Sequence, residues 1–149
     1  MQLEDILKMV ELFRGLNEDQ LHQIMKISQE ENYKNGEVIF DQGATGDKMY
    51  IVGAGQVEIK IKSHTGYTFS AVYLGEGQVF GEMALVDEST RSAAVISAQD
   101  NTVVYSIPAS DFTELCKTDT AIGYLMMRNI AQDLSFKMRH RDLDPSSRA

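Results

Sequence analysis

The sequence predicts a mainly β domain with flanking helices, an α+β protein built on a small antiparallel barrel or sandwich. Nine of the 11 glycines fall between Gly36 and Gly81, where they separate short β-type runs. Amphipathic helical spacing occurs before this zone and after it. Many short strands with regular turns favour a barrel or sandwich over a parallel α/β sheet.

The composition bounds the class of protein. A chain of 149 residues, 43% hydrophobic and 24% charged, fits a single globular domain over residues 1–149. No apolar run approaches the roughly 20 residues that cross a bilayer, and the acidic amino end does not resemble a signal peptide. The one cysteine, Cys116, excludes an internal disulfide framework and suits a reducing compartment. We therefore expect a cytoplasmic protein without a membrane partner.

Residues 1–30 are predicted to form two short helices. Asn17 and Gln20 have the spacing of a reciprocal helix cap, so the second helix should begin after Asn17, with a turn from Arg14 to Asn17. Apolar residues recur at helical spacing: Ile6, Leu7, Val10, Leu21, Ile24 and Met25.

Residues 31–108 are predicted to form the β zone. "VEIKIK" at 57–62 alternates apolar and polar side chains, as a half-buried antiparallel strand does. "SHTGYT" at 63–68 is a hairpin tip, and "TVVYSI" at 102–107 alternates again. Pro108 ends the zone.

Residues 109–142 are predicted to form two C-terminal helices. Ser110 can cap a short one, and Thr118 or Asp119 a longer one that reaches about Arg141. The longer helix carries an apolar stripe widened on one side: Ile122, Met126, Ile130, Leu134 and Met138, with Leu125, Met127 and Ala131.

This apolar arc is broader than one contact surface hides, which predicts that the helix packs on the barrel and also pairs with a second copy in a homodimer. The remaining residues, 143–149, are a polar tail.

Several classes of chemistry lack support. The histidines His22, His64 and His140 fall in different predicted elements, so none shares a metal-ligand spacing with another. Cys116 has no neighbouring histidine and is expected to be a small core residue. The sequence also has neither a Gly-rich phosphate loop ending in Lys-Ser/Thr nor a dinucleotide fingerprint. We expect a protein that is not an enzyme, without a metal or cofactor.

The net charge of −8 opposes binding to nucleic acid, which depends on neutralising phosphates. The basic cluster at 137–142 is small and flanked by acids. No direct DNA binding is expected.

"FGEMALVDESTRSAA" at 80–94 places an acid, Glu82, nine positions before a base, Arg91. The two could form a surface ion pair, which would contribute only about 0–1 kcal/mol. Alternatively, Arg91 holds one phosphate, "EMAL" forms a helical turn beside it, and Gly81 lets the ligand approach the backbone. Glu82 repels a bare phosphate but accepts a sugar hydroxyl, so this reading requires a ligand with both groups.

"FGEMALVDESTRSAAV" closely resembles the phosphate-binding cassette of cyclic nucleotide-binding domains, those of bacterial catabolite activators and protein kinase A regulatory subunits. "LFRGLNEDQL", "GEVIFDQGATGDKMYIVGAGQVEI" and "IPASDF" follow the family's order, and the resemblance covers most of residues 10–115. It implies an eight-stranded antiparallel β-roll, a jelly-roll-like double-stranded β-helix, with helices before and after it.

The resemblance also implies the site. Glu82 would accept the ribose 2′-OH and Arg91 would pair with the cyclic phosphate of cAMP or cGMP, within a cassette at 80–93. The other implied ligand-binding residues are Phe80, Gly81, Met83, Ala84, Ser92 and Ala93.

Two departures concern the base and the output. Where bacterial activators carry a Thr-Ser pair that contacts adenine, this chain has Lys137 and Met138, and Ser135, Lys137 or Arg141 could substitute. Ser92 is compatible with either nucleotide, and we favour cAMP over cGMP. In those activators a winged-helix DNA-binding domain follows the long helix, but too few residues remain here for one.

Three hypotheses stay open at this point. The leading one is a non-catalytic sensor in which the ligand shifts the last helix. The second is the sensor fragment of a larger transcription regulator or effector. The third is a scaffold that binds proteins without a ligand. The sequence does not identify the downstream partner.

Overall fold

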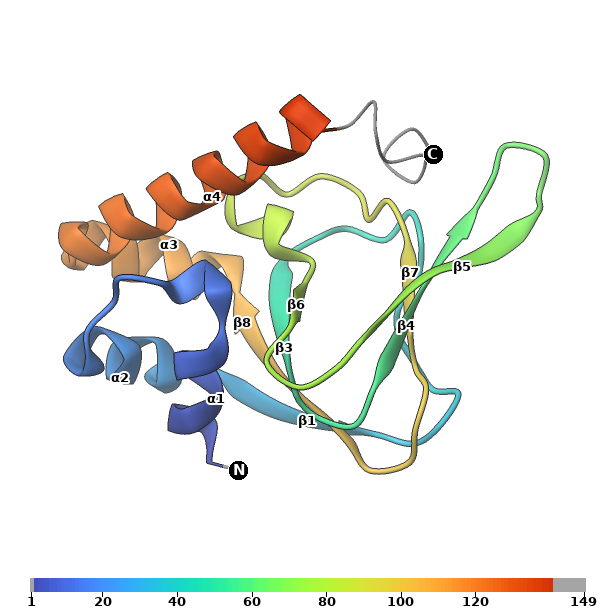
Figure 1. Cartoon of the computed structure of the whole chain (residues 1–149), viewed down its shortest axis with the longest axis horizontal. Coiled ribbons are helices and arrows are strands. Elements are labelled where there is room, and N and C mark those ends of the chain that lie inside the picture. Colours follow the sequence, from blue (N-terminus) through green and yellow to red (C-terminus); the bar gives the residue numbers. More distant parts are fainter. Residues whose placement is uncertain (1, 141–149) are drawn as a thin grey trace.

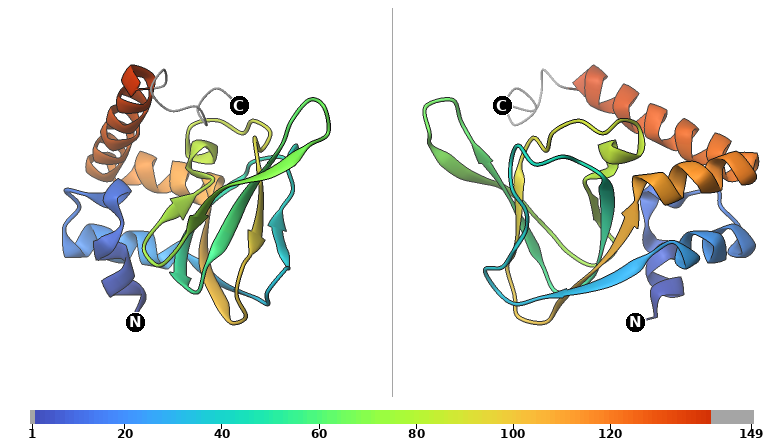
Figure 2. Two further views of the ribbon diagram at one scale, coloured as in Figure 1. Left: turned by 45° about the vertical axis from the view of Figure 1, so that its right-hand side comes forward. Right: turned by 180° about the vertical axis from the view of Figure 1, so that it is seen from behind.

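The computed structural model describes residues 2–140, in which a helical part packs against one side of a β-roll (Figure 1). Both ends of the chain contribute to the helical part, so the N-terminal helices and the last two helices lie together (Figure 2). The predicted tail, residues 143–149, and Arg141 lie outside the described residues. The helical elements are α1 (Leu3–Met9), the 3-10 helix η1 (Glu11–Phe13), α2 (Glu18–Lys26), the 3-10 helix η2 (Glu82–Leu85), α3 (Ala109–Thr118) and α4 (Thr120–His140).

The roll consists of two four-stranded antiparallel sheets with the orders β1-β8-β3-β6 and β2-β7-β4-β5. This architecture confirms the predicted fold class. The alternation at 57–62 is β4, and the hairpin tip lies where it was predicted, between β4 and β5. The strands are β1 (Gln29–Tyr33), β2 (Val38–Phe40), β3 (Lys48–Ala54), β4 (Val57–Lys62), β5 (Thr68–Leu74), β6 (Val79–Phe80), β7 (Ala94–Ser97) and β8 (Thr102–Pro108).

The predicted helix start at Asn17 is confirmed in detail. The Gln20 backbone N–H donates to Asn17 Oδ1 and the Asn17 N–H donates to Gln20 Oε1, each over 2.9 Å. Two donors at the start of α2 are thereby satisfied by the reciprocal cap. The first strand begins at Gln29, inside the segment assigned to the N-terminal helices.

At the C-terminal side one cap is confirmed and one is wrong. Asp119 caps α4, because its Oδ1 accepts from the Ile122 N–H over 3.2 Å. Ser110 does not cap α3, which begins at Ala109 with Pro108 in the capping position. The strand β8 runs directly into this helix, and the Ala109 N–H donates to Asp47 O over 2.8 Å, so Ser110 already lies in the first turn.

Two hydrophobic clusters form the core. One joins the helices to β3, β8 and η2, and includes Phe13, Ile24 and Phe112. The other fills the roll and consists of Tyr50, Val52, Val57, Phe80, Val95 and Val104.

The predicted apolar stripe of α4 is buried through Ile122, Met126 and Ile130, and Leu134 packs against the helical core. Met138 is an exception, because its side chain is 67% exposed. The last turns of α4 run past the helical core and over η2 (Figure 1), so the stripe loses its packing surface there. Within residues 2–140, no helix combines the length and the apolar character that crossing a bilayer requires.

Candidate functional site

The cassette segment, residues 80–93, connects β6 to β7 through η2 and a loop. The predicted helical turn in "EMAL" is confirmed as η2. The loop that precedes β3 holds the far end of the cassette by backbone hydrogen bonds. The Arg91 N–H donates to Ala44 O over 2.7 Å, and the Gly43 N–H donates to Arg91 O over 2.8 Å. These bonds fix the backbone from which the Arg91 side chain extends.

Arg91 is a buried cation without a carboxylate partner. It is 8% exposed, and its Nη2 and Nη1 donate to the carbonyl oxygens of Lys48 and Gly81 over 2.6 and 3.3 Å. Its buried Nε has no hydrogen-bond partner. Among residues 2–140, no carboxylate forms an ion pair with it. Buried charges are normally paired, so this arrangement leaves the guanidinium available to an anion.

Aromatic rings support the guanidinium from the interior of the roll. The Arg91 Cζ lies 4.1 Å from the centre of the Phe40 ring and 5.9 Å from that of Tyr50. Tyr50 in turn stacks on Phe80, with ring centres 5.0 Å apart. Cation–π attraction therefore compensates part of the desolvation of Arg91.

Burial lowers the pKa of Arg91 from its usual value, and Tyr50, Asp47 and Glu82 oppose this shift. An arginine side chain stays protonated in proteins, so the site keeps its positive charge.

Two glycines make room for the guanidinium. Gly81 has φ +71°, and a Cβ built on it would lie 2.7 Å from Arg91 Nη1. A Cβ on Gly46 would lie 2.9 Å from Ser89 O and 3.3 Å from the same nitrogen. Gly81 was predicted to let a ligand approach the backbone, and the structure adds that it lets Arg91 approach. Gly46 was not predicted, although it lies in one of the segments that carry the family resemblance.

Glu82 does not pair with Arg91. Its side chain is 23% exposed, and its Oε1 lies 3.7 Å from Lys137 Nζ of α4. The structure thus excludes the first interpretation of the sequence, an ion pair between Glu82 and Arg91, for the conformation described. It leaves the second, in which both residues face one ligand.

A cavity of about 500 Å³ brings the predicted residues together, a size typical of small-molecule sites. Apolar side chains of the roll complete its wall, and of these Phe40, Ile59, Val72 and Leu74 were not predicted. All eight predicted cassette residues line the cavity: Phe80, Gly81, Glu82, Met83, Ala84, Arg91, Ser92 and Ala93.

The three residues predicted to contact the base lie in different surroundings. Lys137 lines the cassette cavity. Ser135 lines a different hollow, and its Oγ accepts from Arg139 Nη1 over 2.8 Å. Met138 is exposed and does not line the cassette cavity. Their roles in reading a base stay predictions, as does that of Arg141, which lies outside the described residues.

Comparison with known proteins gives a consistent result. Residues 30–119 match the family model described as the cyclic nucleotide-binding domain. The chain is 30% identical over 133 residues to the cyclic AMP receptor protein of Thermus thermophilus, covering 89% of this chain and 59% of that protein. It is 36% identical over 96 residues to a cGMP-dependent protein kinase of Drosophila melanogaster, isozyme 2 forms cD5/T2, covering 64% of this chain and 10% of the kinase.

The fold agrees with these similarities. The crystal structure of the Thermus thermophilus catabolite activator protein superposes with a TM-score of 0.79 at 30% identity, over 89% of this chain and 60% of that one. The chain spans about three-fifths or less of the length of these relatives. Since the family model covers more than half of the sequence and the β-roll is present, the chain belongs to the cyclic nucleotide-binding domain family.

Proposed function

We propose that this domain is a non-catalytic sensor of a cyclic nucleotide, with cAMP preferred over cGMP. The observation that carries the proposal is Arg91, a buried guanidinium with no carboxylate partner among residues 2–140, facing a cavity that Glu82 also lines. A planar fork of donors binds a phosphate well.

The charge and polarity of the cavity favour one class of ligand. The cyclic phosphodiester carries about one negative charge, which matches the single guanidinium. A second charge would be repelled by Glu82, whose carboxylate instead suits the ribose 2′-OH as a hydrogen-bond acceptor. Apolar side chains such as Val72 and Leu74 offer contact to a base. The names of the relatives divide between the two nucleotides, and the preference for cAMP rests on the similarity to the cyclic AMP receptor protein.

The output of the sensor is proposed to pass through α4. This helix contacts the cassette through Lys137 and the N-terminal segment through Arg14, whose Nη2 lies 3.3 Å from Asp133 Oδ1. A ligand shifts such an arrangement only by its differential affinity for the two states. At 100 times the dissociation constant this amounts to at most about 2.7 kcal/mol.

We further propose a homodimer through α4 and a cytoplasmic location, with no direct DNA binding by this domain. The exposed side chains of Tyr124 and Met127 on α4 support the homodimer. The sole cysteine supports the cytoplasmic location, and the net charge of −8 opposes binding to DNA.

Calorimetric titration with cAMP and cGMP tests the sensor function. The wild type should bind in a saturable manner. Arg91→Ala should weaken the binding roughly tenfold to hundredfold, because it removes charge-assisted hydrogen bonds to the phosphate. Glu82→Gln should weaken it by a smaller factor, because a neutral amide oxygen still accepts a hydroxyl.

Circular dichroism spectra must show that both variants fold. If the wild type binds neither nucleotide at high micromolar concentration, or folded Arg91→Ala binds as well as the wild type, the sensor function is wrong. A ligand-free role as a protein scaffold would then be favoured.

A further inference from the structure

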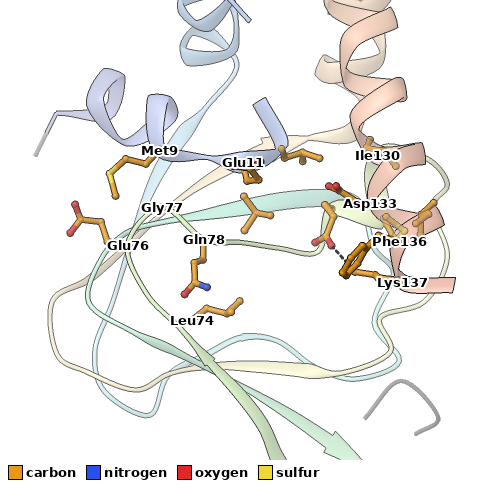
Figure 3. Close-up of a pocket in the computed structure, with 15 residues that line it drawn as sticks. Met9, Glu11, Leu74, Glu76, Gly77, Gln78, Ile130, Asp133, Phe136 and Lys137 are labelled. Carbon is orange, nitrogen blue, oxygen red and sulfur yellow. Dashed lines mark ion pairs between the residues drawn. The ribbon is translucent and has the colours of Figure 1, made fainter. Parts of the chain in front are cut away.

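The two ends of the cassette are held by different parts of the chain. The end with η2 borders a second cavity of about 480 Å³, which Glu82 lines together with residues of η1 and α4 (Figure 3). The other end is held by the loop between β2 and β3, whose residues 43–46 exchange backbone hydrogen bonds with residues 89–91. This loop therefore determines where the phosphate-binding end of the cassette lies.

Gln42 joins the same loop to the end of β4. Its Nε2 donates to Lys62 O over 3.1 Å, and its Oε1 accepts from the Lys62 N–H over 2.7 Å. The next residue, Gly43, donates its N–H to Arg91 O over 2.8 Å. One loop residue and its neighbour thus connect the last residue of β4 to the backbone of Arg91.

The register of β4 against β7 shows where the ladder between these strands ends. The strands are antiparallel, and their last pair is Lys60 opposite Ala94. At the other end, the Ala98 N–H donates to Gln56 O over 2.8 Å, which marks a hydrogen-bonded position. Such positions recur at every second residue, so the last pair is also a hydrogen-bonded one.

Lys62 and Ser92 would form the next hydrogen-bonded pair if the ladder continued. No backbone hydrogen bond joins these two residues in the described part of the chain. The amide of Gln42 takes both backbone groups of Lys62, whereas Ser92 and Ala93 turn away to line the cassette cavity. Gln42 therefore occupies the place on β4 that the cassette has left.

We propose that Gln42 is a positioning residue for the phosphate-binding end of the cassette. By occupying the N–H and C=O of Lys62, it stops the cassette from pairing with β4 beyond Ala94. The Ser92 N–H therefore stays at the cavity, next to Arg91, where it can donate to a phosphate. Gln42 itself does not line the cavity. This inference rests on the proposed function and adds a residue that acts on the site through the backbone.

The chemistry of the side chain suits this role. A glutamine amide carries both a donor and an acceptor, as a peptide group does, so it satisfies the N–H and the C=O of one residue at once. Methionine has a similar length without an amide, so Gln42→Met removes both hydrogen bonds with little change in shape. The backbone groups of Lys62 then become available to Ser92.

Calorimetric titration with cAMP of the wild type, Gln42→Met and Gln20→Met tests the proposal. Gln20 is the matched control, since its Oε1 also accepts from a backbone N–H, that of Asn17 at the start of α2, over 2.9 Å. We expect Gln42→Met to bind cAMP roughly three- to tenfold more weakly, the effect of about one hydrogen bond. Gln20→Met should bind as the wild type does.

Hydrogen exchange of the Ser92 amide in the nucleotide-free proteins separates positioning from a general loss of stability. When the cassette pairs with β4 in Gln42→Met, the Ser92 N–H donates to Lys62 O and its exchange slows. A substitution that only destabilises the fold speeds exchange wherever it loosens the structure. We therefore expect slower Ser92 exchange in Gln42→Met and no slowing in Gln20→Met.

Two kinds of failure can be told apart. Wild-type affinity in Gln42→Met, or Ser92 exchange that is unchanged or faster in this variant, would overturn the positioning role and leave the sensor function intact. Absence of cAMP binding by the wild type would overturn the sensor function and the role of Gln42 with it.

Discussion

At the scale of single residues, the charge on Arg91 is stabilised by dipoles and rings instead of a counter-ion. Two carbonyl oxygens and the faces of Phe40 and Tyr50 surround the guanidinium. Breaking a buried ion pair to bind a ligand costs several kcal/mol. A phosphate that approaches Arg91 does not have to displace a carboxylate, because none is paired with it among residues 2–140.

Gly81→Ala should destabilise the fold and weaken nucleotide binding. The φ of +71° alone disfavours a Cβ by about 1–2 kcal/mol, and contact of the new methyl with Arg91 Nη1 adds to this. Gly36→Ala is the matched control, since Gly36 has φ +87° and no atom within 4 Å of a built Cβ. Urea unfolding should show about 1 kcal/mol of loss for Gly36→Ala and about 2–3 kcal/mol for Gly81→Ala. Equal losses would show that Arg91 yields to the methyl.

Cys116 should react slowly with alkylating agents in the folded protein. Burial raises the pKa of its thiol, and Asp119 raises it further. A raised pKa leaves less thiolate at a given pH, so the iodoacetamide rate at pH 8 should fall below that of a free thiol and should rise only in more alkaline solution. Unfolding in urea should restore the ordinary rate. A folded-state rate equal to that of free cysteine would contradict the burial of this side chain.

The residues of the site differ in how far the sequence predicts them. That Glu82 and Arg91 line one cavity was predictable, because an acid beside an anion-binding base fits a ligand with both a hydroxyl and a charge. The contribution of Lys48 was not predictable, because its backbone carbonyl accepts a hydrogen bond from Arg91 and every residue type has such a carbonyl. Gly46 matters through a clash that only the folded chain reveals.

At the scale of elements, α4 is held by a buried amide. Asn129 is 4% exposed, and its Nδ2 lies 2.9 Å from both Leu12 O and Arg14 O. Leu12 belongs to η1 and Arg14 follows it directly, so this side chain ties the last helix to the first part of the chain. Helical spacing predicted α4, but it did not predict this tie, since an asparagine reads as a polar interruption of an apolar stripe.

Asn129→Ala should therefore destabilise the domain more than the loss of an exposed polar side chain would. Two carbonyl groups would lose their donor, which lowers the free energy of unfolding by roughly 2–3 kcal/mol and the Tm by roughly 5–10 °C. Gln132→Ala is the control, because its amide oxygen accepts from Arg14 in an exposed position and should change stability by less than about 0.5 kcal/mol. Equal Tm values for the two variants would mean that Asn129 does not anchor the helix. Scanning calorimetry provides the measurement.

The element boundaries were predicted where a local hydrogen bond defines them. The caps at Asn17 and Asp119 are short-range features of the sequence. The start of α3 is instead set by a long-range bond from Ala109 to Asp47, which explains why Ser110 was wrongly expected to cap it. Met138 was placed in the apolar stripe because the spacing continues, although the surface beneath the helix does not.

At the scale of the whole molecule, the roll and the helices have different roles. The roll holds the aromatic support and the cassette, while the helical part joins both ends of the chain (Figures 1 and 2). The fold class was predictable because glycine-separated runs and flanking helical periods each point to it. One side of α4 packs on the helical core and another leaves apolar residues exposed. This division was only partly predictable, because an apolar stripe in the sequence does not show which of its residues the rest of the chain covers.

The proposed homodimer depends on the face of α4 that the chain leaves uncovered. Ile130 is 3% exposed and belongs to the core, so a charge at that position would unfold the protein and would not report on dimerisation. Tyr124 and Met127 are 64% and 41% exposed and provide the better test. A charge on an apolar contact loses its hydration when a partner covers it.

Sedimentation at high micromolar concentration should show a dimer for the wild type and a monomer for Tyr124→Asp and Met127→Asp. The Tm values of these two variants should stay close to that of the wild type, because both substituted side chains are exposed and the core of the monomer is unchanged. Tyr67→Asp at the tip of the β4–β5 hairpin is the control, since Tyr67 is 68% exposed and lies on the roll. A wild-type monomer at every concentration, or dimers that persist in both α4 variants, would mean that this face is not the dimer interface.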